Sequence, residues 1–100
     1  MKIDITQNNN SITVAVAGRL DTVTASEFEQ EIKPFFSAQG LELVMDCSAM
    51  EYISSAGLRV VLMAHKSITA NGGRFAVRNL INEVRSVFDL TGFSRILTIE

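Results

Sequence analysis

The stretch Tyr52-Ile53-Ser54-Ser55-Ala56-Gly57-Leu58 joins a hydrophobic run to the longest clean helical pattern in the chain. Apolar residues then recur at helical spacing along one face, formed by Leu58, Val61, Leu62, His65 and Ile68. This pattern predicts a helix from about Ser55 to Thr69, with Ser54 and Ser55 at its N-terminus. Serine oxygens there cap free backbone N–H groups, and the positive end of the helix dipole also suits a phosphate, on a ligand or on a serine. The stretch is therefore either a simple cap or a switch.

Three strands are predicted before this helix. Ile3–Thr6 alternates apolar and polar residues, Asn8–Asn10 is a turn signal, and Ile12–Ala17 alternates again, so these segments predict a two-stranded hairpin. Leu41–Asp46 is apolar enough for a strand that is covered on both faces. We expect this third segment to be a central parallel strand.

Two further helices are predicted, one on each side of the serine stretch in sequence. Thr24–Glu27 has the Thr-x-x-Glu form of a capping box, so a helix is expected to begin near Ala25, and Pro34 should kink or shorten its last turn. The core-facing positions expected for this helix are Ala25, Phe28, Ile32, Phe35 and Phe36. The other helix is predicted over Asn82 to Thr91, with Gly92 as its stop.

The last strands complete a β-β-α-β-α-β-α-β order. Asn71-Gly72-Gly73 ends the central helix, Arg74–Arg78 alternates as a strand, and Ile96–Ile99 is predicted as the final strand. Such an order predicts an α/β fold with a mixed, mostly parallel sheet and packed helices. A chain of 100 residues with 47% hydrophobic content fits one domain, so we assign residues 1–100 to a single domain.

The composition argues against several classes of function. Nine Lys and Arg against eleven Asp and Glu give a formal net charge of −2, which offers no broad basic surface for nucleic acid or anionic lipid. Cys47 has no partner cysteine for a disulfide or a zinc cluster, and one histidine with dispersed carboxylates gives no metal-ligand spacing. Neither a signal peptide nor an apolar run of about 18 residues is present. We expect a cytoplasmic protein without metal, cofactor, nucleic-acid partner or membrane insertion.

An enzyme would need Ser55 as nucleophile, His65 as base, and Asp21 or Asp46 as the orienting acid. If Ser55 and His65 share a helix, ten positions separate them by about 15 Å, whereas a nucleophile and its base must lie within about 3 Å. The glycine two residues before the serine of a nucleophile elbow is also missing. We therefore predict that the chain is not an enzyme and that His65 lies at the edge of the core.

Nucleotide binding at the same helix start is a third possibility. A phosphate could sit on the turn at residues 55–57, but the sequence has neither a Gly-rich loop with a lysine nor a Gly-x-Gly-x-x-Gly motif. The local residues leave open a simple N-cap at Ser54 or Ser55.

Four motifs follow one another along the chain: Gly18-Arg19-Leu20-Asp21, Asp46-Cys47-Ser48, Ile53–Leu58 and Leu90-Thr91-Gly92-Phe93. Together they resemble the STAS domain family, and in particular a stand-alone bacterial anti-sigma factor antagonist. Ile53–Leu58 and Gly18-Arg19-Leu20-Asp21 carry most of this resemblance. Asp46-Cys47-Ser48 and Leu90-Thr91-Gly92-Phe93 fall in the same order as in the family. The resemblance covers essentially the whole chain and implies a STAS-type fold.

The resemblance implies a partner switch controlled by phosphorylation. The unmodified antagonist would bind an anti-sigma factor that is also a serine kinase, phosphorylation would end this binding, and a serine phosphatase would reset it. Matching the family's Asp-Ser-Ser-Gly-Leu through Gly57 places the phosphorylated serine at Ser55, the family's acid at Ser54, and the following serine at Ala56. Ser54 is a second candidate acceptor. The resemblance also implies that Asp21 lies near the serine, and that the partner-binding surface consists of Asp21, Ser54, Ser55, Ala56 and Gly57. The alternative is a STAS scaffold or ligand-binding module that is not phosphorylated; the chain would be a monomer or a weak dimer.

Overall fold

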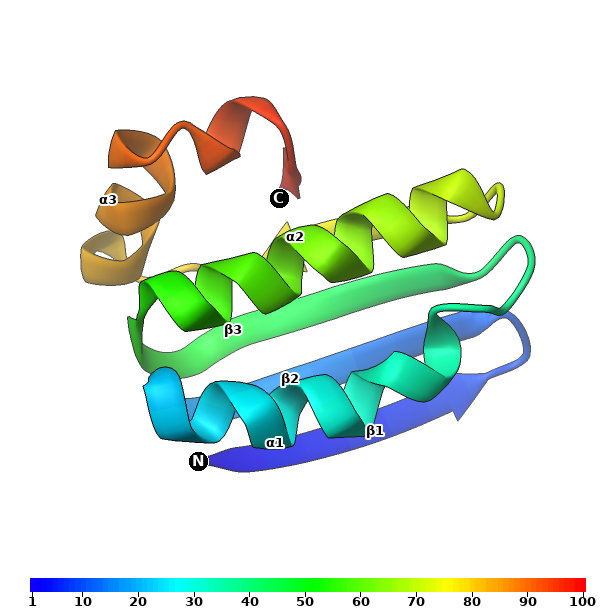
Figure 1. Cartoon of the computed structure of the whole chain (residues 1–100), viewed down its shortest axis with the longest axis horizontal. Helices are drawn as coiled ribbons and strands as arrows, with labels where there is room; N and C mark the ends of the chain where they lie inside the picture. Colours follow the sequence, from blue (N-terminus) through cyan, green and yellow to red (C-terminus); the bar gives the residue numbers. More distant parts are fainter.

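A five-stranded mixed sheet forms the centre of the computed structural model, which covers residues 1–100 (Figure 1). Its strands are β1 (Lys2–Asn8), β2 (Ser11–Leu20), β3 (Glu42–Ile53), β4 (Arg74–Arg78) and β5 (Thr98–Ile99). They lie in sequence order across the sheet, with β1 antiparallel to β2 and every other neighbouring pair parallel. The predicted hairpin, the element order and the central position of the third strand are confirmed.

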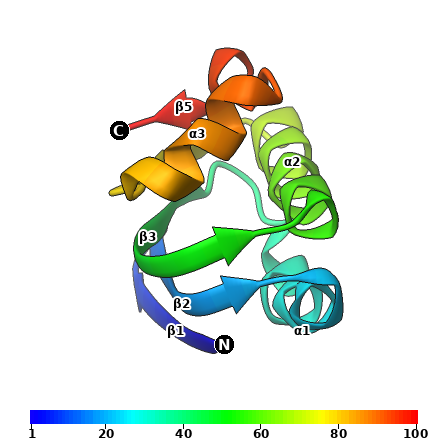
Figure 2. The ribbon, with the colours of Figure 1, turned by 90° about the vertical axis from the view of Figure 1, so that its left-hand side faces the viewer.

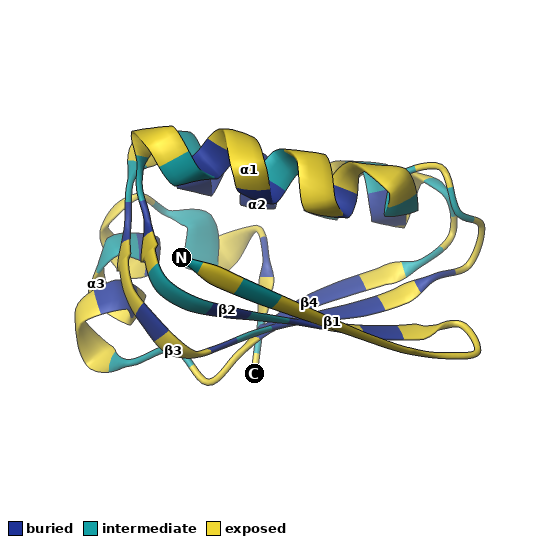
Figure 3. Cartoon of the chain, turned by 90° about the horizontal axis from the view of Figure 1, so that it is seen from below, coloured by how far each residue is buried: buried dark blue, intermediate teal, exposed yellow.

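Three helices cover this sheet: α1 (Thr22–Ile32), α2 (Ser55–Ala70) and α3 (Asn82–Leu90). Helices α1 and α2 lie side by side over one face of the sheet (Figures 1 and 3). The shorter α3 packs against β3 at one end of the sheet (Figure 2). Because parallel strands need a crossover, each helix returns the chain to the edge from which the next strand starts.

The core lies between β2, β3 and β4 and the two long helices. Leu43, Val44 and Met45 are consecutive and all buried, which confirms that β3 is covered on both faces. Helix α1 contributes Phe28, and α3 contributes Phe88, each almost fully buried. This arrangement assigns most of the hydrophobic content to packing, as expected for a domain of this size.

Helix α1 begins three residues earlier than predicted. Its N-cap is Asp21, whose carboxylate accepts hydrogen bonds from the N–H groups of Val23 (3.0 Å) and Thr24 (2.9 Å). The Thr24 hydroxyl accepts in turn from the Asp21 N–H at 2.8 Å, so Thr24 occupies the last position of a capping box and not the first. The predicted start near Ala25 is therefore wrong. Pro34 does shorten the helix, because a 3-10 turn over Lys33–Phe35 follows it.

Only β4 has its predicted length, because β1 and β2 extend beyond their predicted ranges at both ends, β3 is longer and β5 is shorter. Strand β3 continues to Ile53, past the predicted end at Asp46, and pairs with β2 through two register irregularities, one of them next to Gly18 at φ +93°. Strand β5 starts only at Thr98, because a 3-10 turn over Phe93–Arg95 ends in Ile96, whose backbone is helical and not extended. The extension of β3 places its end beside the end of β2.

Helix α2 matches its predicted range closely and ends at Ala70, with Asn71 as its C-cap. Its buried positions are Gly57, Leu58, Val60, Val61, Ala64 and Ile68. Leu62 and His65, which we placed on the core face, are only partly buried. The His65 ring packs edge-on against Phe75, with ring centroids 6.3 Å apart, so the predicted place at the edge of the core is confirmed.

No helix of the structure is both long enough and apolar enough to cross a bilayer.

Candidate functional site

The N-termini of α1 and α2 lie next to each other at one edge of the sheet. Leu20 and Ile53 are partners at the paired ends of the parallel strands β2 and β3, and each strand runs directly into a helix. The Ser54 N–H donates to the Leu20 carbonyl at 2.8 Å, which ties the two strand ends together. Asp21 and Ser54 thus follow neighbouring strands and cap neighbouring helices. We call residues 21 and 54–57 the cap edge.

Ser54 uses its hydroxyl as the cap of α2. The hydroxyl oxygen accepts from the Gly57 N–H at 3.1 Å, and the Ser54 carbonyl accepts from the Leu58 N–H at 2.9 Å. The residue is half-buried and has the extended backbone of an N-cap. The Ser54 hydroxyl oxygen is therefore already used in capping the N-terminus of α2.

Ser55 differs from Ser54 in all these respects. It is the first residue of α2, its side chain is exposed, and its hydroxyl makes no hydrogen bond within the chain. The next residue, Ala56, is half-buried and packs against the hydrophobic core, and it carries no hydroxyl. Of the three positions at the helix start, only Ser55 therefore presents a free, accessible nucleophile.

Gly57 lets α2 start close to the strand ends. A Cβ atom at this position would lie 2.8 Å from Cγ of Leu20 and 3.0 Å from Cγ1 of Ile53 and from the Leu20 carbonyl oxygen. A Cβ contact of 2.8 Å is essentially absent from proteins, and contacts of 3.0 Å are tighter than nine in ten, so a side chain would require Leu20, Ile53 or the helix start to shift. The glycine is therefore required by packing.

Replacing Gly57 with alanine is expected to lower the free energy of unfolding by about 1–3 kcal/mol, the usual cost of overpacking. In an exposed helix interior the same change would be stabilising by about 1 kcal/mol, because alanine has the higher helix propensity. Urea denaturation of the two proteins gives both the sign and the size. A more stable variant would contradict the close packing of Gly57 against Leu20.

Asp21 brings a negative charge to the cap edge. The pKa of this carboxyl lies below its ordinary value, mainly because the carboxylate accepts a hydrogen bond from the Thr24 N–H. Hydrogen bonds from the Thr24 side chain and from the Val23 N–H lower the pKa further, and so does the positive charge of Arg19. Asp21 is therefore ionised at neutral pH. Any second negative charge at the start of α2 would lie on the same edge of the sheet.

Sequence reasoning did not foresee a cation–aromatic pair beside the cap edge. The Arg19 guanidinium lies over the Tyr52 ring at 4.2 Å from its centroid, because the two residues are partners on β2 and β3. Tyr52 is 39% exposed, and Val23 in the first turn of α1 is 82% exposed. Only the register of the extended β3 brings Arg19 and Tyr52 together, and that extension was not predicted.

The residues of the enzyme hypothesis do not form a catalytic group. His65 packs on Phe75. It lies ten positions after Ser55 on α2, which corresponds to about 15 Å along the helix axis. Its Nδ1 atom is buried without a hydrogen-bond partner, so no carboxylate orients the ring through that atom. Ser55 and His65 therefore do not form a Ser–His–Asp triad with Asp21 or Asp46.

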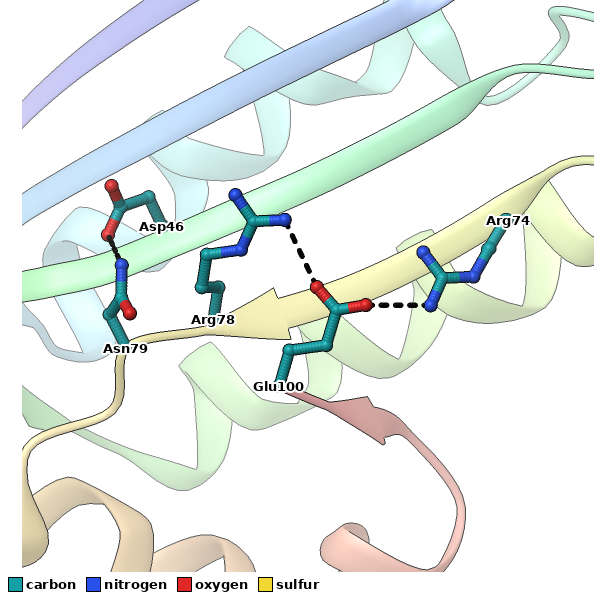
Figure 4. Close-up of polar contacts among 5 residues, drawn as sticks. All are labelled: Asp46, Arg74, Arg78, Asn79 and Glu100. Carbon is teal, nitrogen blue, oxygen red and sulfur yellow. Dashed lines mark hydrogen bonds and ion pairs between the residues drawn. The ribbon is translucent and has the colours of Figure 1, made fainter.

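Asp46 belongs to a different cluster, drawn in Figure 4. Its Oδ1 accepts from the Ser48 N–H at 3.0 Å and from Asn79 Nδ2 at 3.3 Å, and the first of these bonds is the main reason that its pKa is lowered. Nearby, Glu100 bridges Arg74 at 2.7 Å and Arg78 at 3.1 Å. These contacts connect β3, β4 and the residue that follows β5, and Asp46 forms no hydrogen bond or ion pair with His65.

The sheet order and the two capped helices define a single-domain α/β protein with paired helix starts at one edge. The model of the STAS domain matches residues 2–100, and the chain therefore belongs to the STAS domain family. It is similar to the anti-sigma-B factor antagonist of Bacillus subtilis, with 30% identity over 99 residues, which cover 99% of this chain and 90% of that protein.

Solved structures show the same fold. An anti-sigma factor antagonist from Mycobacterium paratuberculosis superimposes with a TM-score of 0.86 at 26% identity, and the match covers 98% of this chain and 83% of that one. The anti-sigma factor antagonist SpoIIAA in its unphosphorylated form gives a TM-score of 0.84 at 17% identity, covering 99% and 88%. The likeness to SpoIIAA establishes the fold, and the relative from Bacillus subtilis is an anti-sigma-B factor antagonist.

Proposed function

We propose that this protein is an anti-sigma factor antagonist, and that phosphorylation of Ser55 controls its binding to an anti-sigma factor with serine kinase activity. One observation carries the choice of residue: the Ser55 hydroxyl is exposed and unbonded, whereas the Ser54 hydroxyl caps α2. The relatives, which are antagonists of anti-sigma factors, support the class of partner.

The proposed modification is a simple phosphoryl transfer. The Ser55 Oγ attacks the γ-phosphorus of ATP, an O–P bond forms, and the bond between that phosphorus and the ADP oxygen breaks. The serine proton passes to a base of the kinase. A serine phosphatase would reverse the modification by hydrolysis of the new bond. The phosphate adds about −1.5 to −2 charges at the N-terminus of α2, where the helix dipole favours negative charge, so the fold accommodates it.

Phosphorylation of Ser54 would have a structural cost that phosphorylation of Ser55 does not. The Ser54 oxygen is the acceptor for the Gly57 N–H, and loss of an N-cap typically costs about 1 kcal/mol. Ser54 also occupies the place of the family's acid. It keeps the capping hydrogen bond without the charge, so Asp21 is the carboxylate that remains at the cap edge.

The phosphate would mainly change the affinity of the partner for the cap edge and not the fold of this protein. Asp21 and a phosphorylated Ser55 would place two anionic groups at the neighbouring starts of α1 and α2, and the first turn of α1 also carries the exposed apolar side chain of Val23. A partner that docks there must remove water from both anions and tolerate their charge. Regulatory coupling of about 1–3 kcal/mol, equivalent to 5–150-fold in affinity, is typical of such switches.

The first test measures binding of the kinase-like anti-sigma factor to Ser55→Ala and Ser55→Asp. Ser55→Ala should bind like the unmodified protein, and Ser55→Asp should bind at least about 5-fold more weakly. Ser11→Asp is the matched control, because Ser11 is exposed at the opposite end of β2 and receives the same charge. Equal affinity for Ser55→Asp and Ser55→Ala would contradict an electrostatic switch and would favour an unphosphorylated scaffold.

The second part of the test locates the phosphate. After incubation with the partner and ATP, mass spectrometry should find one phosphate on Ser55, which persists in Ser54→Ala and disappears in Ser55→Ala. A partner that binds and is active as a kinase, but labels neither serine, would overturn the proposal.

A further inference from the structure

Arg59 is an arginine without an acidic partner on the exposed side of α2. The three ion pairs of the structure use Lys2, Arg74 and Arg78 as cations, and none of them involves Arg59. The only polar contact of its guanidinium joins Nη1 to the sulfur of Met63, at 3.7 Å. A thioether is a weak acceptor, so this contact holds the guanidinium only loosely.

Ser55 and Arg59 are four residues apart on the same helix, and both are exposed. Residues at this spacing are neighbours, with Cβ atoms about 5–6 Å apart, and an acid that precedes its base along the helix is the favourable order. The Cα–Cβ bond of a helical residue tilts toward the N-terminus, which suits a contact with Ser55. The guanidinium of Arg59 now reaches one turn the other way, to Met63, so a contact with a group on Ser55 requires the side chain to change rotamer.

We infer that Arg59 is the intramolecular partner of a phosphate on Ser55. This inference rests on the proposed function, in which Ser55 carries the phosphate. The guanidinium leaves the sulfur of Met63 and binds two phosphate oxygens, because a bidentate, charge-assisted pair is far stronger than a contact with a thioether. Phosphorylation then changes the surface of α2 twice: it adds an anion at residue 55 and moves a cation that was free to meet the partner.

The pairing can be measured in the isolated protein. Phosphoserine is installed at position 55 during translation, and the phosphate is titrated by ³¹P NMR. Phosphoserine loses its second proton near pH 6, and a cation about 4 Å away favours the doubly charged form. Arg59→Gln should therefore raise the titration midpoint by about half a pH unit, and Arg59→Lys should restore part of the difference.

Lys66→Gln is the matched control. It removes one positive charge from an exposed position of the same helix, eleven residues from Ser55 or about 16 Å, which exceeds the screening length of about 8 Å at physiological salt. Its midpoint should equal that of the parent phosphoprotein. A methyl-labelled sample adds a second measurement, since the Met63 methyl signal should shift on phosphorylation in the parent and stay in place in Arg59→Gln.

Equal midpoints in the parent and in Arg59→Gln, or a Met63 signal that ignores the phosphate, would overturn the pairing. Because the phosphate is installed without a kinase, these results do not depend on recognition by one. A midpoint shift without kinase labelling of Ser55 would support the pairing and contradict the proposed function. Kinase labelling of Ser55 without a midpoint shift would support the proposed function and contradict the pairing with Arg59.

Discussion

Replacing Phe88 with alanine is expected to lower the free energy of unfolding by about 3–5 kcal/mol, the range for a buried phenylalanine. Phe88 is fully buried and belongs to α3, a helix of nine residues that buries only one other side chain, Val84. The N-cap of α3, Ile81, makes no side-chain capping bond. The packing of Phe88 therefore holds the helix against β3. Urea denaturation measures the loss, and hydrogen exchange of the α3 amides shows whether this helix detaches first.

Leu90→Ala is the control for this experiment. Leu90 lies two residues further along the same helix, is also apolar, and is 88% exposed. Its replacement should change the free energy of unfolding by less than about 0.5 kcal/mol. A comparable loss in the two variants would mean that α3 is not anchored through Phe88.

Gly73→Ala is expected to cost about 3 kcal/mol, at the upper end of the cost of overpacking. A Cβ atom at Gly73 would collide with the Leu41 carbonyl oxygen and would lie 2.9 Å from Cγ2 of Ile68. The same carbonyl accepts the Arg74 N–H at 2.8 Å, where β3 and β4 begin to pair. Relief of the collision would therefore weaken both the end of α2 and the start of β4. Thermal unfolding and urea denaturation give the loss.

Gly72→Ala separates this collision from the general effect of losing a glycine. Gly72 precedes Gly73 and has φ +76°, but a Cβ atom there meets nothing within 4 Å. Its replacement should cost only about 1–2 kcal/mol, the strain of a left-handed conformation. If the Gly72 variant were the less stable of the two, backbone conformation and not crowding would govern this connection.

The features that the sequence predicted well are those with strong local patterns. The hairpin has strict alternation, and α2 has both a long helical repeat and a clear stop at Asn71–Gly73. The start of α1 was misplaced because two overlapping capping patterns compete there. Thr24 and Glu27 match the usual pattern, but Asp21 accepts two backbone N–H groups and so fixes an earlier start. Local composition does not decide between such alternatives.

The remaining differences depend on contacts between distant segments. Residues 47–53 do not alternate simply, so nothing in their own pattern extends β3; pairing with β2 does so, through register irregularities. The stacking of Arg19 on Tyr52 follows from that pairing and could not be predicted without it. The proximity of Asp21 to the serines came from the family resemblance, and the structure adds why: Leu20 and Ile53 end neighbouring strands.

Leu20 restrains the start of α2 in two ways, through its carbonyl on the Ser54 N–H and through its side chain against Gly57. We therefore expect the start of α2 to keep its position on the sheet if a phosphate is attached to Ser55. A phosphate on Ser55 would then change the charge of the cap edge without changing the conformation of the backbone. The backbones of the modified and unmodified proteins should therefore superimpose, and a partner would distinguish them only through direct contact with residue 55.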